Sequence, residues 1–135
     1  MEIELADLLA ELNPCVYVID CLPNMTPEQV VERTEPLVHR LRAARSDTPI
    51  LLVEDRTFTN ARFLQSHLEL HGRRRAALRI SYENLIADNL PALHYMEGAG
   101  ILGHDGEATT DGSHPNDLGM MRYADGYEKV LREVI

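Results

Sequence analysis

The sequence predicts an α/β domain built on a parallel sheet. Two short runs, Cys15–Ile19 and Ile50–Val53, are almost wholly apolar and rich in β-branched side chains, which is typical of strands buried on both faces. Segments with the apolar spacing of helices alternate with these runs, and such alternation favours right-handed crossovers between parallel strands. A chain of 135 residues is long enough for one core, so we expect residues 1–135 to form a single domain.

The N-terminal half is expected to hold two helices. Residues 2–12 carry apolar side chains at helical spacing, and Asn13-Pro14 ends that helix. Thr26-Pro27-Glu28-Gln29 has the pattern of a capping box, which predicts a helix from there to residue 45. Pro36 is expected to kink or split this helix.

The C-terminal half is expected to hold a long helix, a third strand and a last helix. Residues 60–90 are helical with a break at Gly72, and residues 92–96 form the strand. Residues 97–113 contain five of the eight glycines, and a loop of that length in a compact domain is functional or disordered. The last helix covers residues 115–134.

Composition limits the function and the compartment. The net charge of −9 argues against binding of a nucleic-acid backbone, and Arg73-Arg74-Arg75 is interpreted as a solvated helix end. No run is apolar enough to span a membrane, and the start lacks the features of a signal peptide. Cys15 and Cys21 lie about 20 Å apart if they share one strand, too far for a disulfide. We therefore expect free cysteines packed in the core and a cytoplasmic protein.

The segment Asp111-Gly112-Ser113-His114-Pro115 carries the chemistry of greatest interest. An Asp that accepts the Nδ1–H of a His three residues later fixes the imidazole, whose Nε2 can then remove a proton from a nucleophile. The same segment also fits the start of a helix, with His114 as the N-cap, Pro115 at the first helical position and the following Asp117 in the first turn. Loops 20–25, 54–57 and 97–114 would meet at the carboxyl edge of the sheet, where ligands bind in open α/β folds.

These blocks resemble the SGNH (GDSL-type) hydrolases, over nearly the whole chain but only the C-terminal two-thirds of that fold. Asp111–Pro115, followed by Leu118-Gly119, looks like the family block that supplies the triad Asp and His. Residues 17–25 look like the block whose Asn donates to the oxyanion hole, here Asn24, in a D-C-x-P-N-M form rather than the commoner G-x-N-D form. Glu54–Thr57 and Leu102–Thr109 look like the same subgroup.

The resemblance implies a flavodoxin-like α/β/α fold of strand order 2-1-3-4-5, of which this chain would hold strands 3-4-5. It implies hydrolysis or transfer of acyl groups from a small-molecule or carbohydrate ester, by a Ser-His-Asp mechanism that needs no metal or other cofactor. Asp111 and His114 would be catalytic and Asn24 would serve the oxyanion hole, although Asn24 also fits a turn after Pro23. Glu54, Asp55, Arg56 and Gly103 are candidates for substrate-facing loops, and the first three also fit a local ion pair.

One catalytic part is missing. The family's nucleophile follows its first strand in a G-D-S block, whereas the serines of this chain are Ser46, Ser66, Ser81 and Ser113, none in that context. Either the chain belongs to a longer ester hydrolase, or it is an inactive remnant that serves as a binding or oligomerisation module. Without the family's first two strands, the run 15–19 of this chain would be an unprotected sheet edge, so we expect a homo-oligomer formed through it.

Overall fold

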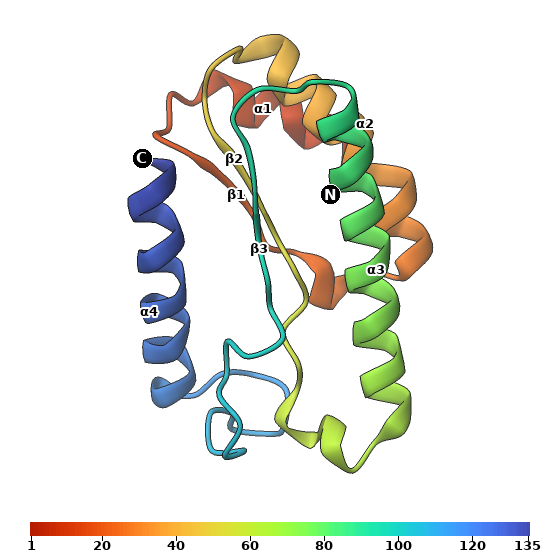
Figure 1. The fold of residues 1–135 in the computed structure, drawn as a ribbon, viewed down its shortest axis with the longest axis vertical. Coiled ribbons are helices and arrows are strands. Elements are labelled where there is room, and N and C mark those ends of the chain that lie inside the picture. The colour runs from red at the N-terminus through yellow and green to blue at the C-terminus, as the bar shows by residue number, and fades with distance from the viewer.

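The computed structural model describes all 135 residues and places three parallel strands between two layers of helices (Figure 1). The strands are β1 (Tyr17–Ile19), β2 (Ile50–Val53) and β3 (Leu93–Met96), in the order β1-β2-β3. Tyr17 is in register with Ile50, and Ile50 with Leu93. Because both pairs are parallel, the carboxyl ends of all three strands lie at one edge, as the sequence predicts.

Helices cover both faces of this sheet. The helices α1 (Glu4–Glu11), α2 (Pro27–Ala44) and α3 (Gln65–Ala87) lie on one side, and α4 (Asp117–Val134) lies alone on the other (Figure 1). Alternation along β2 divides the core between the two faces: Ile50 and Leu52 join the larger cluster under α2 and α3, while Leu51 and Val53 join the smaller one under α4. Burial on both faces explains the unbroken apolar run of β2.

The predicted capping box is present. Thr26 accepts a hydrogen bond from the backbone N–H of Gln29, whose side chain accepts one from the backbone N–H of Thr26. Pro36, however, does not split α2, which runs unbroken to Ala44. Pro36 and Glu32 are both exposed, so water can reach the Glu32 carbonyl that loses its helical donor.

Two expected helix boundaries are wrong. α3 continues through Gly72 because the neighbouring side chains of His71 and Arg74 are buried, and such packing outweighs the roughly 1 kcal/mol that glycine costs within a helix. α4 is capped by Asn116 rather than His114, since the Asn116 Oδ1 accepts from the Gly119 N–H at 3.0 Å. Asp117 does lie in the first turn.

The N-terminal strand is shorter than predicted, and its outer edge is open. Both cysteines are free, but Cys15 precedes β1 and is exposed instead of packing in the core. Burial of Cys21 raises the pKa of its thiol. β1 pairs with β2 alone, and Val18 is 39% exposed. No helix is both long and apolar enough to cross a membrane.

Candidate active site

Asp111 and His114 form the pair that their spacing predicts. The His114 Nδ1 lies 2.7 Å from the Asp111 Oδ2. This contact assigns the proton to Nδ1, because a carboxylate accepts and cannot donate. The Nε2 has no partner in the chain, and the His114 side chain is 77% exposed. His114 is therefore oriented by its neighbour and free to accept a proton at Nε2.

The Asp111 carboxylate is also held by the backbone of its own loop. Its Oδ1 accepts from the His114 N–H at 2.8 Å and from the Ser113 N–H at 2.9 Å. These bonds, the backbone donation from His114 first among them, hold the pKa of Asp111 well below its usual range. The carboxylate thus stays ionised wherever His114 can act as a base.

The loop that carries this pair is docked on the segment after β2. Gly112 has φ +92°, and a Cβ there would lie 2.7 Å from the Asn60 Nδ2. Its carbonyl accepts from the Asn60 N–H and from the Thr59 hydroxyl, both at 3.3 Å. Arg56 donates to the carbonyl of Ser113 at 3.3 Å. Of the candidate loop residues, Arg56 therefore positions the loop that carries His114.

The same loop is fixed on its other side to α4. Residues Thr109 and Pro115 form an antiparallel bridge, and the Asn116 amide donates to the Glu107 carbonyl at 2.7 Å. Gly119 is buried, and a Cβ there would overlap the Ala108 carbonyl oxygen. Gly119 of the Leu118-Gly119 pair thus has a structural role, since only glycine lets α4 approach the backbone of Ala108 so closely.

Asn24 lies at the same edge of the sheet, at the end of the 3₁₀ turn η1 (Leu22–Asn24) that follows β1. The side chain is exposed and makes no hydrogen bond within the chain. The turn is anchored to α3, because the Arg74 Nε donates to the Met25 carbonyl at 2.6 Å. The Asn24 amide is therefore available as a donor on an anchored backbone.

A polar contact that the sequence analysis missed joins this edge to α4. The Tyr127 hydroxyl donates to the Asp20 Oδ2 at 2.7 Å, and the Tyr127 ring stacks on Tyr123 with centroids 5.9 Å apart. Burial raises the pKa of the Tyr123 phenol to about 12. The two tyrosines are four residues apart, a spacing that places both on one helix face and was the available signal.

Glu54 and Asp55 are buried, and the arginines that pair with them lie in α3, so they do not form the local ion pair with Arg56 that the sequence also allowed. Asp55 is fully buried, and its Oδ2 accepts from the His71 Nδ1 at 2.7 Å and from Arg74 at 2.9 Å. Glu54 accepts from the Tyr95 hydroxyl at 2.7 Å and from the Gly98 N–H at 3.1 Å. Arg74 is thus a buried cation, which corrects the interpretation of its basic run as solvated.

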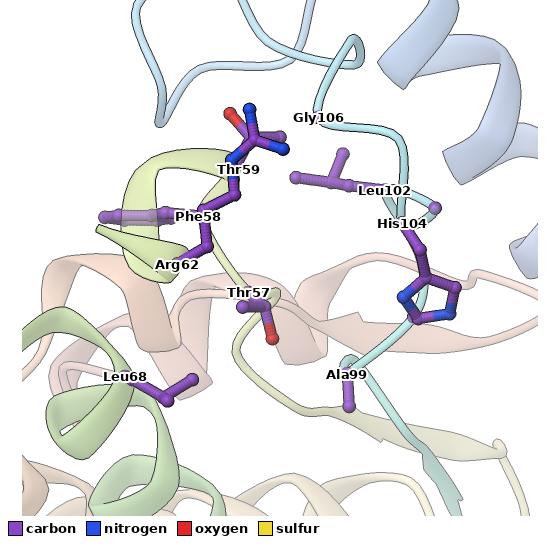
Figure 2. A pocket seen from close by; sticks show the side chains of 11 residues that line it. Thr57, Phe58, Thr59, Arg62, Leu68, Ala99, Leu102, His104 and Gly106 are labelled. Carbon is purple, nitrogen blue, oxygen red and sulfur yellow. The ribbon is translucent and has the colours of Figure 1, made fainter. Parts of the chain in front are cut away.

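A cavity of about 410 Å³ lies between the segment after β2 and the glycine-rich loop after β3 (Figure 2). Thr59, which donates to the Gly112 carbonyl, also lines this cavity, so its wall is continuous with the docking site of the His114 loop. Gly103, exposed and with φ +75°, belongs to the opposite wall. The other lining residues are Thr57, Phe58, Arg62, Leu68, Ala99, Gly100, Leu102, His104 and Gly106.

A model of the GDSL-like lipase/acylhydrolase family matches residues 1–132. The chain belongs to this family. Among solved structures, it is similar to a protein described as a GDSL-like lipase from Bacteroides ovatus, with 33% identity and a TM-score of 0.95 over 99% of this chain and 40% of that one. The resemblance stated from the sequence is confirmed, while no curated protein matches.

The salicylyl-acyltransferase SsfX3 from a tetracycline biosynthetic pathway shares the fold, with a TM-score of 0.79 and 15% identity over 98% of this chain and 41% of that one. This GDSL-family chain therefore spans about two-fifths of the length of both solved proteins. Its three-stranded α/β arrangement confirms the predicted fold class.

None of the four serines of this GDSL-family chain is placed to be activated by His114. Ser46 bonds to Asp47 in an exposed turn, while Ser66 and Ser81 lie within α3. Ser113 adjoins His114, but its hydroxyl makes no hydrogen bond to the imidazole, whose Nδ1 bonds to Asp111. The structure thus contains an oriented base and leaves it without a nucleophile.

Proposed function

We propose that this domain is the base-bearing part of an enzyme that hydrolyses or transfers an acyl group from an ester. The observation that carries the proposal is the Asp111–His114 pair, joined at 2.7 Å on an exposed loop with Nε2 free. Membership of the GDSL-like lipase/acylhydrolase family supports the reaction class. Small-molecule or carbohydrate esters are the proposed substrates.

In the proposed mechanism, the His114 Nε2 takes the proton of a serine hydroxyl while the serine Oγ attacks the ester carbonyl carbon. Asp111 remains ionised and stabilises the imidazolium that forms. The Asn24 amide donates to the developing oxyanion. The imidazolium then protonates the departing alkoxide, and water or a second alcohol, activated by the same Nε2, releases the acyl group from the serine.

The nucleophilic serine is proposed to come from residues outside 1–135. The positions of Ser46, Ser66, Ser81 and Ser113 support this assignment, as does the 40% coverage of the Bacteroides ovatus protein. Loss of one triad member removes several powers of ten of rate. The isolated chain is therefore proposed to be inactive as an ester hydrolase.

Measurements on the 135-residue chain and on a longer polypeptide test the mechanism. The 135-residue chain should hydrolyse p-nitrophenyl acetate no faster than its His114→Ala variant, and a fluorophosphonate should label none of its serines. A longer polypeptide that adds a G-D-S block should gain hydrolysis that requires the added Ser, His114 and Asp111. In that protein Asn24→Ala should lower kcat by about 10²–10³. A folded longer protein that is inert towards a panel of acetyl and longer acyl esters would remove the proposal.

A second candidate function, as an oligomerisation module, is favoured by the open edge of β1. The Tyr17 N–H donates towards β2, so the N–H of Val18 points outward. Two copies related by a two-fold axis at Val18 would pair their β1 strands in antiparallel fashion. Light scattering with size exclusion should then show a dimer, and Val18→Pro, which removes an outward N–H and no hydrogen bond to β2, should give a monomer. Val31→Ala, on the exposed surface of α2, is the control. A wild-type monomer at tens of micromolar would refute this candidate.

A further inference from the structure

We propose that the cavity between residues 57–68 and 99–106 binds a small molecule with an anionic group on a short apolar body. The volume of about 410 Å³ falls within the range of small-molecule sites. His114 and Asn24 do not line the cavity. Binding there is independent of the proposed ester chemistry and can be measured on the chain itself.

One side of the cavity offers apolar surface that is already ordered. The Phe58 ring is held by edge-on contacts with the rings of His71 and His67, at centroid distances of 4.4 and 5.8 Å. Leu68 lines the same cavity, with 45% of its surface exposed. A ligand that covers Phe58 and Leu68 would remove apolar surface from water without having to order these side chains first.

The charge available at the cavity is that of Arg62. Every other arginine of the chain donates a hydrogen bond to a carboxylate or to a backbone carbonyl, whereas the Arg62 guanidinium donates none. The guanidinium carbon lies 4.6 Å from the centroid of the Phe63 ring. Arg62 is exposed, so in a chain of net charge −9 its guanidinium is free to pair with an anion supplied by a ligand.

The opposite wall lies close to Arg62, and both walls add donors. Gly106 has φ +86°, and a Cβ there would lie 3.1 Å from the Arg62 guanidinium, so glycine lets that guanidinium lie close to this wall. His104 extends its ring towards the cavity from the loop after β3 (Figure 2) and has no hydrogen bond in the chain. The Thr57 Oγ1 accepts from Arg75 at 2.6 Å, which leaves its proton for a ligand. Carboxylate and phosphate groups share the chemistry that such donors recognise.

The test is calorimetric titration of the isolated chain with hexanoate, hexyl phosphate and 1-hexanol at neutral pH. We expect at least one of the two anions to bind with a Kd below about 1 mM, and 1-hexanol to bind at least tenfold more weakly. The tighter anion identifies the ligand as a carboxylate or a phosphate. Arg62→Gln should weaken anion binding at least tenfold, while Arg132→Gln, which removes the same charge from the exposed surface of α4, should leave it unchanged.

Ala99→Phe provides a second variant that does not alter charge. Ala99 is an exposed residue of the cavity wall, so a phenyl ring there should fill the cavity and abolish binding without disturbing the core, as circular dichroism would verify. The proposal is overturned if neither anion binds, if 1-hexanol binds equally well, if Arg62→Gln and Arg132→Gln weaken binding equally, or if Ala99→Phe binds like the wild type. None of these results bears on His114-dependent hydrolysis.

Discussion

Replacing Asp55 by Asn is expected to remove a large part of the stability of the domain. The Asp55 side chain is fully buried and accepts from both His71 and Arg74 through one oxygen. The Arg74 side chain is itself only 9% exposed. Asn keeps one acceptor but cancels the negative charge, so the Arg74 cation remains buried without a counterion. The Asp55 Oδ1 has no partner in the wild type, and an Asn NH₂ placed there would be a buried donor without an acceptor.

The magnitude follows from these two losses. Removing one member of a buried ion pair costs about 3–5 kcal/mol, because the other charge is left uncompensated. Domains of ordinary stability unfold at a cost of about 5–15 kcal/mol, so Asp55→Asn should remove a large share of the free energy of unfolding. Arg74→Met in the same chain removes the stranded cation. The double variant should therefore be more stable than the sum of the two single effects predicts, by about 1–3 kcal/mol.

Urea unfolding followed by far-UV circular dichroism measures these differences. With a slope of about 1–3 kcal/mol per molar urea, Asp55→Asn should lower the midpoint by at least about 1 M. A loss below about 1 kcal/mol, or single effects that add to within about 0.5 kcal/mol in the double variant, would refute the reasoning. Arg73→Met, whose partner Glu28 is exposed, is the control and should change the free energy of unfolding by less than about 1 kcal/mol.

Three further predictions concern the groups around the site. Carboxyl-detected NMR should show that the pKa of Asp111 lies well below its usual range. The stability that Asp111 provides is therefore present above its unfolded pKa of about 3.9 and is lost as the pH falls through the folded pKa. An ordinary pKa for Asp111 would contradict the loop geometry. Tyr123, with a pKa raised to about 12, provides stability that is present below about pH 10 and is lost as the pH rises through the folded value. Phenolate absorbance should therefore show Tyr123 titrating late in the wild type, and Tyr123→Phe should remove that late transition; titration of Tyr123 near pH 10 in the folded chain would be the contrary result. Gly112→Ala should destabilise the chain by about 1–3 kcal/mol, because φ is +92° and the added methyl group meets Asn60. Gly72→Ala, in open space on α3, should instead stabilise the chain by about 0.5–1 kcal/mol. Equal effects of the two substitutions in urea unfolding would be evidence against the docking of the His114 loop.

Local chemistry determined what the sequence could predict. The capping box at Thr26 and the Asp111–His114 pair each lie within four residues, and both form as expected. β2 has the predicted bounds because an apolar run buried on both faces leaves no other arrangement. These features depend on neighbours that the sequence displays side by side.

The features that could not be predicted depend on partners distant in the chain. Asp55 contacts His71 and Arg74, which lie 16 and 19 residues further along the chain. The polar residues after β2 therefore gave no sign that Glu54 and Asp55 would be buried. Arg74 lies between two exposed or half-buried arginines, and the burial of Arg74 alone follows from the face of α3 that packs towards Met25. The cavity beside Phe58 needs two loops to meet, and neither loop specifies it alone.

The exposure of His114 and the open edge of β1 point to the same requirement. A base that is 77% exposed works in water, where the charge interactions that stabilise a transition state are weak. Asn24 follows β1 by one short turn, so a strand added to the outer edge of β1 would end beside Asn24, at the carboxyl edge where His114 lies. A serine at the end of such a strand would stand between the base and the oxyanion donor. One added segment would then satisfy the edge, supply the nucleophile and exclude water from His114, which is why the proposed enzyme requires residues beyond 1–135.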